Sequence, residues 1–356
     1  MKKDIFPLYY DDGICSEPGS QLRNNNIEKF KKAIDNKELR FVDNRCLCHN
    51  EHPENDIVIS EKDRYGFAIP QILCSKCGLI RSGMVLDETS NRLFYEKYYR
   101  GIYLASTSTQ DKNEQIHALF SDQYGRGKRI LSLVKNQITL DETALVAEVG
   151  CGAGGVLLPF KEIGLNVIGY DFDNGYLNYG RDKGLNLCYG DFYELSHNAS
   201  CDFILINHVL EHFLDPIGEL CRLLPKLKVG GYLYIEVPGI LNIHKAYISP
   251  ILYFQNAHVY NYYKDFLRVM FEKLGLKVVY GDEVCRFIVQ KTNDKIPDNK
   301  AIYDETLSHY PQLIMEYLAN TKRWERWNYR ILKRQLKNII PDSLVTTVRR
   351  LVNYIN

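Results

Sequence analysis

Apolar runs alternate with amphipathic stretches through the middle of the chain. Strand-like apolar runs lie at residues 144–149, 166–170, 202–206 and 231–237. Helix-like segments such as 217–227 separate these runs, which is typical of a parallel sheet covered on both faces. Residues 277–280 and 284–290 are separated by Gly-Asp-Glu, a spacing that predicts an antiparallel hairpin at the sheet edge. The pattern therefore predicts a doubly wound α/β fold with a mostly parallel sheet.

Five segments differ in composition along the chain. They are a polar segment at 1–40 with a short helix at 27–34, a cysteine-containing segment of short strands at 41–90, a helical segment at 91–142, the α/β region at 143–290 and a basic, helical extension at 291–356. The length allows one large domain with attachments, or two to three small domains, and the chain contains no internal repeat.

The composition is that of an ordinary globular protein. Hydrophobic residues make up 45% of the 356 residues, and a net charge of +1 provides no strong field for nucleic acid. No apolar run approaches the roughly 18 residues of a membrane span. The N-terminus has two lysines but lacks the apolar core of a signal peptide. We therefore expect a cytoplasmic protein whose ten cysteines are reduced and bind metal where they cluster at ligand spacing.

A glycine-rich loop follows the first apolar run of the α/β region. Residues 148–155 read Glu-Val-Gly-Cys-Gly-Ala-Gly-Gly. Gly150, Gly152 and Gly155 match the dinucleotide pattern G-x-G-x-x-G, whereas Glu148 with Gly150, Gly152 and Gly154 matches E-x-G-x-G-x-G. Glycines after a strand let a ligand approach backbone N–H groups and a helix N-terminus. A tight turn without a ligand remains the alternative.

Three acidic residues end strands near this loop. Glu148 lies two residues before the first glycine, where it would accept a hydrogen bond from a ligand ammonium or orient the loop. Asp171 ends the second strand, the position at which an acidic side chain binds a ribose diol. Asp191 follows a third strand, in Leu-Cys-Tyr-Gly-Asp-Phe, within reach of an adenine amino group.

Two further stretches carry a family resemblance, Cys-Asp-Phe-Ile-Leu-Ile-Asn-His-Val-Leu-Glu-His and Leu-Lys-Val-Gly-Gly-Tyr-Leu-Tyr-Ile-Glu-Val-Pro. With the loop and the acids, residues 143–290 resemble the class I S-adenosylmethionine-dependent methyltransferases. The resemblance implies a Rossmann-like fold and S-adenosylmethionine as cofactor. The cofactor contacts that it implies are Glu148, Gly150, Gly152, Gly154, Asp171, Phe172, Asp191, Phe192, Asn207 and His208. A dehydrogenase would not need Asp191 or the loop at 207–212.

The cysteines at 46–77 have the spacing of a metal site. Cys74-x-x-Cys77 forms a tight knuckle that offers two thiolates to one ion. The second pair of ligands would be Cys46 and Cys48, which are separated by one residue. Alternatively, it would be Cys46 and His49, which are separated by two residues like Cys74 and Cys77. Four ligands in two pairs predict a structural zinc ribbon, because a site with four protein ligands has no open position for catalysis. Four reduced cysteines in a metal-free loop are the alternative.

The segment around this knuckle carries a second resemblance. Asp-Arg-Tyr-Gly-Phe-Ala-Ile-Pro-Gln-Ile-Leu-Cys-Ser-Lys-Cys-Gly-Leu-Ile, followed by Phe-Tyr-Glu-Lys-Tyr-Tyr-Arg, resembles the zinc-binding segment ahead of some sugar methyltransferases. These include C-methyltransferases that act on nucleotide-linked deoxysugars. The chain departs from them in its irregular first cysteine pair and is too short for their large C-terminal domain.

Catalytic candidates follow from the chemistry of methyl transfer. A hydroxyl or an acidic carbon as acceptor needs a general base, and histidine suits that role near neutral pH. His208 and His212 follow the fourth strand, and His258 lies in Asn-Ala-His-Val-Tyr-Asn. The sugar-methyltransferase resemblance implies that His258 faces the acceptor, so it is our predicted base, whereas His212 is expected to pack the loop over the cofactor.

A tyrosine-rich stretch is a second source of acceptor contacts. The tyrosines are three to five residues apart on a predicted helix, at Tyr95, Tyr98, Tyr99 and Tyr103. Their rings and hydroxyls would contact a sugar or base, with Tyr99 as a catalytic candidate, or would simply pack in the core. Arg100 lies among them and is a candidate phosphate contact.

The basic extension contains an apolar stripe, formed by Trp324, Trp327, Ile331, Leu332, Leu336 and Ile339. Such a helix would pack on the protein, form a dimer contact or lie on a membrane surface, the last of which suits cell-envelope polysaccharide synthesis. We therefore expect a methyltransferase that acts on a nucleotide-sugar or a surface-glycan precursor. The alternatives are a zinc-ribbon RNA base methyltransferase, disfavoured by the near-neutral charge, and a non-catalytic cofactor-binding subunit.

Overall fold

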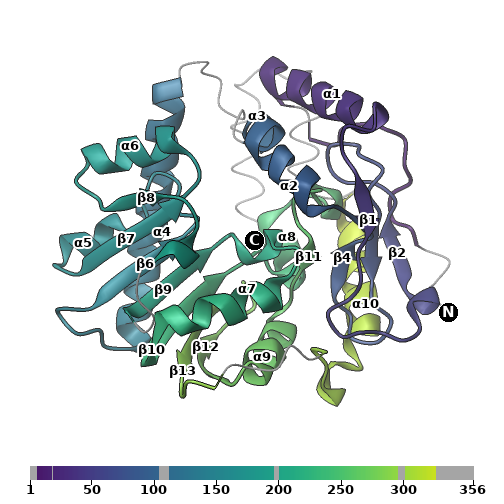
Figure 1. Ribbon diagram of the computed structural model, residues 1–356. Helices are drawn as coiled ribbons and strands as arrows, with labels where there is room; N and C mark the ends of the chain where they lie inside the picture. Colours follow the sequence, from purple (N-terminus) through teal and green to yellow (C-terminus); the bar gives the residue numbers. More distant parts are fainter. Residues whose placement is uncertain (1–5, 18, 104–111, 196–199, 296–300, 326–356) are drawn as a thin grey trace, which may run out of the picture.

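A seven-stranded sheet forms the centre of the α/β region (Figure 1). The computed structural model describes residues 6–17, 19–103, 112–195, 200–295 and 301–325. The strands of this sheet are β6 (Leu145–Val149), β7 (Asn166–Asp171), β8 (Leu187–Tyr189), β9 (Cys201–Asn207), β10 (Leu227–Glu236), β12 (Leu276–Gly281) and β13 (Arg286–Lys291). Their order is β12-β13-β10-β9-β6-β7-β8. The pairs from β10 to β8 are parallel, and β13 is antiparallel to both of its neighbours, so the predicted sheet and edge hairpin are confirmed.

Helices cover both faces of this sheet. The helices are α4 (Lys112–Gln137), α5 (Leu158–Glu162) and α6 (Asn174–Asp182) on one face, and α7 (Pro216–Leu223) and α9 (Lys264–Lys273) on the other. Alternate strand residues point to opposite faces, so Val146 packs with the first group and Ala147 with the second. The strand order reverses at β6, which has β9 on one side and β7 on the other. Ligands of open α/β sheets bind at such a point, beyond the carboxyl ends of the strands.

Two predicted boundaries in this region are wrong by several residues. The helix predicted at 217–227 ends at Leu223, because Pro225 has no backbone N–H to continue it, and a single turn follows. Strand β10 begins at Leu227 instead of 231, and the register with β9 shifts between Leu227 and Tyr232. Gly230 and Gly231 lie in that irregular stretch, where glycine accommodates the bulge.

The cysteine-containing segment forms a separate four-stranded sheet with the order β11-β4-β3-β2. Its strands are β2 (Ile57–Ser60), β3 (Gln71–Leu73), β4 (Ile80–Ser82) and β11 (Tyr260–Asn261), and a two-stranded pair, β1 (Phe41–Asp43) and β5 (Met84–Leu86), flanks it. Strand β11 comes from the region predicted at 143–290 and pairs with β4 of the segment predicted at 41–90. One core cluster contains Leu73 and Ile80 together with Tyr262 and Phe266.

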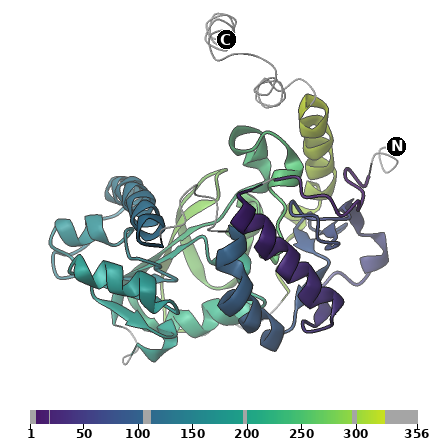
Figure 2. The same ribbon diagram turned by 90° about the horizontal axis from the view of Figure 1, so that it is seen from above.

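The N-terminal and tyrosine-rich helices lie together (Figure 2). Helix α1 (Gln21–Asp35) contains the helix predicted at 27–34, and the Ser20 side chain caps it by accepting a hydrogen bond from the Arg23 N–H. Phe30 is fully buried, with its ring 5.1 Å from that of Phe94. Phe94 ends α2 (Glu88–Phe94), which continues through a π-helical turn, η3 (Tyr95–Tyr99), into α3 (Arg100–Tyr103).

The C-terminal part of the described chain is α10 (Tyr310–Glu325), which packs on the cysteine-containing segment. The rings of Tyr263 and Tyr310 are stacked with centroids 4.2 Å apart. The predicted apolar stripe from Trp327 to Ile339 lies outside the described residues. Among the residues that the structure describes, no helix is long and apolar enough to span a bilayer.

Short elements complete the described part of the chain. They are α8 (Ile243–Ala246) and the single turns η2 (Pro53–Asn55), η4 (Phe192–Glu194), η5 (Leu210–His212), η6 (Leu224–Lys226), η7 (Ile240–Asn242), η8 (Pro250–Leu252) and η9 (Glu305–Leu307). The turn η5 follows the carboxyl end of β9, and α8 lies between β10 and β11 in the sequence. Both therefore belong to the connections that emerge beyond the carboxyl ends of the parallel strands.

Candidate functional site

The glycine loop leaves the carboxyl end of β6 at the point where the strand order reverses. Gly150 and Gly152 have φ angles of 67° and 55°, a left-handed conformation that favours glycine. A Cβ atom on Gly150 would lie 2.8 Å from the Val209 side chain, and one on Gly152 would lie 2.8 Å from the Gln123 amide. The two glycines therefore allow the loop to pack closely against Val209 and Gln123, which a residue with a side chain would prevent.

Helix α4 holds this loop through a residue that the sequence analysis missed. The Gln123 side chain donates a hydrogen bond to the Cys151 carbonyl at 3.1 Å and accepts one from the Gly155 N–H at 3.2 Å. A Cβ atom on Gly155 would lie only 2.5 Å from the Phe120 carbonyl oxygen of the same helix. Gly155 therefore allows close packing of the helix on the loop.

Glu148 lies beneath the loop as a buried carboxyl group. Its side chain is 2% exposed, and Oε2 has no hydrogen-bond partner among the described residues. Burial raises the pKa of Glu148 well above its ordinary value, and the charge of Arg126 opposes this only in part. A buried oxygen without a partner is costly, so this position suits a ligand that donates a hydrogen bond.

Asp171, at the end of β7, is the predicted ribose contact. It accepts hydrogen bonds from the N–H groups of Gly152 and Asp173, each at 2.9 Å. The Arg100 guanidinium lies 3.5 Å from Asp171 Oδ1 and also pairs with Asp173. Each carboxylate oxygen has two acceptor sites, so Asp171 retains capacity for a diol. Arg100 therefore lies against the predicted ribose acid, and its role as a phosphate contact stays a prediction.

Two exposed aromatic rings flank the ends of β7 and β8. Phe172 and Tyr189 are 67% and 54% exposed, and their rings meet edge to face at 6.1 Å. Asp191 accepts a hydrogen bond from the Tyr193 N–H and so begins η4. Phe192, a predicted cofactor contact, is buried, and its ring meets that of Tyr170 edge to face at 5.6 Å. Its contact with the cofactor stays a prediction.

The loop after β9 carries the other predicted contacts. Asn207 is mostly buried, and its Oδ1 has no hydrogen-bond partner among the described residues. His208 has a φ of 55°, which is uncommon for a residue other than glycine. Its N–H donates to the Glu236 carbonyl at 2.8 Å, a bond that holds this turn at the end of β10.

Three histidines surround one buried carboxylate in this loop. Glu211 is 1% exposed, and its Oε1 lies 3.4 Å from Nδ1 of His208 and 3.9 Å from Nε2 of both His212 and His258. Burial favours the protonated form of Glu211, but the surrounding imidazoles outweigh it and hold the pKa of this carboxyl at about 2. Val209, which precedes η5, contacts the glycine loop, so the cluster lies next to the loop.

Of the two inner histidines, His212 is the more accessible. Its side chain is 15% exposed, and its Nδ1 lies 2.9 Å from the Ala257 carbonyl oxygen and 3.1 Å from the Tyr95 hydroxyl. A proton on Nδ1, donated to Ala257, leaves Nε2 as the free acceptor of the neutral ring. Burial lowers the pKa of His212 below its ordinary value, so the ring is neutral at pH 7.

His258, the predicted base, lies deeper than its sequence position suggests. Its side chain is 4% exposed and packs edge to face on His212, with ring centroids 5.1 Å apart. The Gln255 amide covers its ring nitrogens. Burial lowers the pKa of His258 well below its ordinary value. His258 is therefore less accessible than His212.

The tyrosine-rich helix presents two faces. Tyr95, Tyr99 and Tyr103 recur every four residues. The rings of Tyr95 and Tyr99 are tilted against each other with centroids 4.9 Å apart, and those of Tyr99 and Tyr103 are stacked at 4.7 Å. Tyr99 also meets the His212 ring edge to face at 6.0 Å. Tyr98 points the other way, with its ring 5.3 Å from that of Phe30 in the core. Three of the four predicted tyrosines therefore face the histidine cluster or its immediate surroundings.

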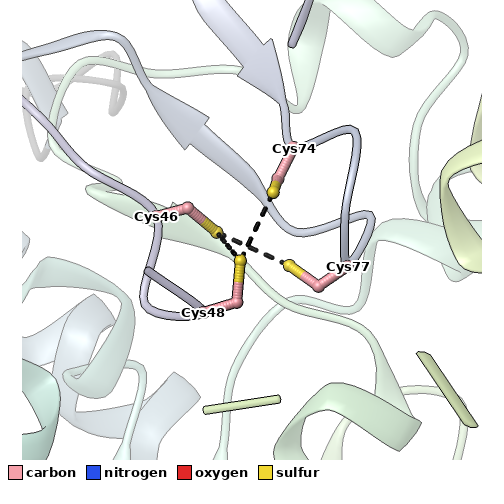
Figure 3. Close-up of side chains that lie close together, drawn as sticks. All are labelled: Cys46, Cys48, Cys74 and Cys77. Carbon is pink, nitrogen blue, oxygen red and sulfur yellow. Dashed lines mark hydrogen bonds between the residues drawn. The ribbon is translucent and has the colours of Figure 1, made fainter. Parts of the chain in front are cut away.

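The sulfur atoms of the four predicted cysteines lie close together, Cys46 and Cys48 from the segment between β1 and β2, and Cys74 and Cys77 from the turn between β3 and β4 (Figure 3). The Sγ atoms of Cys46 and Cys48 are 3.4 Å apart, and those of Cys46 and Cys77 and of Cys48 and Cys74 are each 3.5 Å apart. All four are buried and free of disulfides. His49 is exposed, with a φ of 49°, so the structure selects Cys48 over His49 as the fourth candidate ligand.

This arrangement fits one tetrahedral cation. Burial raises the pKa of the Cys77 thiol well above its ordinary value. Four thiols at this separation cannot all ionise without a compensating positive charge, and zinc supplies that charge to Cys₄ sites. An ion held by all four thiolates would have no coordination position left for a substrate, so such a site would be structural.

The acceptor groups around the glycine loop fit the cofactor implied by the E-x-G-x-G-x-G pattern. Glu148 and Asn207 each hold a buried oxygen without a partner among the described residues, and Asp171 has spare acceptor capacity. Glu211 and Gln123 complete the site, and neither was among the predicted contacts. The Glu-His pair at 211–212 was visible in the sequence, whereas nothing in the sequence around Gln123 placed it against the loop.

Comparisons with known proteins agree with this assignment. Residues 123–280 match a family described as "Methyltransferase domain". A segment of 156 residues is 26% identical to the ubiquinone biosynthesis O-methyltransferase of Shewanella pealeana, and it covers 40% of this chain and 65% of that protein. The chain thus spans slightly less than two thirds of that relative's length.

Solved structures of methyltransferases are also similar to part of the chain. One from Archaeoglobus fulgidus has 19% identity and a TM-score of 0.39, and the match covers 58% of this chain and 93% of that one. Another, from Thermotoga maritima, has 18% identity and a TM-score of 0.39, with 51% of this chain and 96% of that one covered.

Proposed function

We propose that this chain, whose residues 123–280 form an S-adenosylmethionine-dependent methyltransferase domain, transfers a methyl group to a hydroxylated, sugar-type acceptor. The observation that carries the proposal is the cluster of Glu211, His212 and His258, which lies next to the glycine loop and beneath Tyr95 and Tyr99. It combines a cofactor cradle with a neutral imidazole and aromatic rings on the acceptor side.

Five groups would hold the cofactor. Gly150 and Gly152 would let it approach the loop backbone, Asp171 would accept from its ribose diol, and Glu148 and Asn207 would provide buried oxygens for its donors. Phe172 and Asp191 lie on the side where an adenine ring would bind. When bound, the cofactor supplies an electrophilic methyl group, so the protein's task is to align the acceptor and remove its proton.

His212 is the best-placed group for that proton. Its Nε2 is the free acceptor when Nδ1 donates to Ala257, and the Tyr99 ring borders it. Glu211 stabilises the imidazolium that forms, because an opposite charge in a buried site favours the charged form. His258 supports His212 from behind as a positioning residue. This assignment replaces the sequence-based choice of His258 as the base.

The cysteine cluster is proposed to bind one structural zinc through Cys46, Cys48, Cys74 and Cys77. The ion would hold the four-stranded sheet whose strand β11 precedes α9 of the methyltransferase domain. Thiolates stay reduced in the cytoplasm, where we place the protein. Peripheral membrane contact through the C-terminal extension concerns residues outside the described part of the chain.

A screen of acceptors tests the proposed function. The full chain is incubated with S-adenosylmethionine and with nucleotide-sugars, simple glycosides or short RNAs, and release of S-adenosylhomocysteine is measured. We expect turnover with a saccharide. Turnover with RNA alone would support the zinc-ribbon RNA methyltransferase instead, and cofactor binding without turnover of any acceptor would support a non-catalytic subunit.

A further inference from the structure

A cavity of about 400 Å³ lies between α8 and α10, outside the glycine loop and the histidine cluster. Its polar and aromatic lining residues are His244, Tyr247, Tyr317, Asn320, Thr321 and Glu325. This volume falls within the range of small-molecule sites, which combine aromatic walls with a few placed polar groups. Neither the cofactor nor the zinc proposed above accounts for it.

Hydrogen bonds fix one wall of the cavity. The Tyr317 hydroxyl lies 2.8 Å from His244 Nδ1 and accepts a bond from the His244 N–H at 3.0 Å. The Thr321 hydroxyl donates to the Tyr317 carbonyl at 2.8 Å. Ring positions that are set by such bonds form a preorganised surface, which reduces the entropy lost when a ligand binds.

The charge in the lining is negative and locally compensated. The Glu325 carboxylate accepts a hydrogen bond from the Tyr9 hydroxyl at 3.1 Å and pairs with Lys322 at 2.8 Å. Lys322 also lies over the Tyr9 ring, 3.7 Å from its centroid. Since this cation already has two partners, the cavity offers carboxylate, amide and hydroxyl groups and is unsuited to a phosphate.

The inner wall leads towards the histidine cluster. The ring of Tyr247 meets that of Tyr253 at 5.6 Å, and the ring of Tyr253 meets that of His258 at 6.5 Å. The Tyr253 hydroxyl donates a hydrogen bond to the Pro238 carbonyl at 2.7 Å. This bond fixes the Tyr253 ring, which lies between Tyr247 and His258, to the segment that follows β10. A ligand in the cavity would therefore lie near the histidine cluster without touching it.

We propose that this cavity binds a neutral, polyhydroxylated ring of the acceptor, a sugar unit remote from the one that is methylated. The inference rests on the proposed sugar-type acceptor and narrows it to an extended glycoside, because a nucleotide diphosphate would place its charge beside Glu325. Aromatic faces suit the C–H surface of a sugar ring, and the amide and carboxylate suit its hydroxyls. The free energy of binding this remote sugar unit would help to align the acceptor hydroxyl with the methyl group of the cofactor.

Binding of simple probes tests the cavity without requiring turnover. Ligand-observed saturation-transfer NMR on the full chain, with S-adenosylhomocysteine present, compares a set of neutral methyl pyranosides with uridine diphosphate. We expect a pyranoside to bind and Asn320→Ala to weaken it by roughly three- to ten-fold, the loss of one neutral hydrogen bond. Tyr317→Phe removes the hydroxyl that bonds to His244, and we expect it to weaken pyranoside binding as well. Gln312→Ala, an exposed position on the same helix, is the matched control and should bind like wild type.

The outcomes separate this inference from the proposed function. No pyranoside binding, equal binding by Asn320→Ala and Gln312→Ala, or a preference for uridine diphosphate that Asn320→Ala removes would each overturn the cavity assignment. Circular dichroism identifies a variant that fails to fold. If pyranosides bind as expected but no saccharide is ever methylated, the proposed function fails while the cavity remains a sugar site.

Discussion

At the level of single residues, Glu211 lies at the centre of the histidine cluster of the candidate site. Its buried carboxylate lies within 4 Å of three histidine nitrogens, and only His208 is substantially exposed among those rings. Burial lowers the pKa values of His212 and His258, which keeps both rings neutral at pH 7. A neutral imidazole beside a carboxylate is prepared to accept a proton, because the charge that forms is immediately compensated.

His212→Ala should lower kcat by roughly 10²- to 10⁴-fold, the usual contribution of a general base. In wild type the active form is the neutral ring, and the pKa of His212 is lowered, so activity should rise with pH through an inflection below 6.5. The variant should lose that inflection. Rates measured between pH 4.5 and 8 with a saturating cofactor check both expectations.

His258 and His117 provide the comparisons for this experiment. His258→Ala should reduce kcat less than His212→Ala and shift the inflection without abolishing it, because His258 contacts the base and not the acceptor. His117→Ala removes an exposed histidine on α4 and should behave like wild type. If His258→Ala alone abolishes the inflection, the original sequence-based choice of base is correct and the revision is wrong.

Asp171→Ala should weaken S-adenosylmethionine binding by about 1.5 to 3 kcal/mol, as for a lost hydrogen bond to a charged group. The structure adds a control, because Arg100 lies against the same carboxylate. Arg100→Met removes a competing ion pair and should leave the affinity equal or higher. Titration calorimetry measures both variants, and unchanged affinity in Asp171→Ala together with binding of NADH would instead favour a dehydrogenase.

At the level of elements, the cysteine knuckle ties the four-stranded sheet together. Purified protein should contain about one zinc per chain, and Cys74→Ser should lower both the metal content and Tm, because metal binding is coupled to folding. Cys188→Ser changes a cysteine on β8 that lies outside the cluster and should affect neither. Elemental analysis measures the zinc content, and calorimetry measures Tm. A metal-free protein of full stability would rule out the zinc site.

At the level of the whole molecule, the two sheets share one core and should unfold together. Strand β11 pairs with β4, and Tyr260, Tyr262 and Tyr263 of this connection are almost fully buried. Chelation of zinc should therefore destabilise the methyltransferase domain as well, in a single cooperative transition. Circular dichroism during heating with and without chelator tests this, and two separate transitions would show independent units.

The sequence predicted the central sheet well because its signals are local. Apolar runs such as the one in β9 and the glycines after β6 follow from periodicity and turn chemistry. The crossing of β11 into the other sheet could not be predicted, because pairing between residues nearly 180 positions apart leaves no local pattern. The depth of His258 was missed for the same reason, since His212 and Glu211, which pack against it, are distant from it in the sequence.

Transfer of a labelled methyl group tests the central claim most directly. The full chain is incubated with S-adenosylmethionine labelled in its methyl group and with neutral glycosides of two or more sugar units, and the label in the saccharide is counted. We predict label in the saccharide with wild type and with His117→Ala, and a 10²- to 10⁴-fold lower rate with His212→Ala. Tight cofactor binding without label in any saccharide would contradict the account.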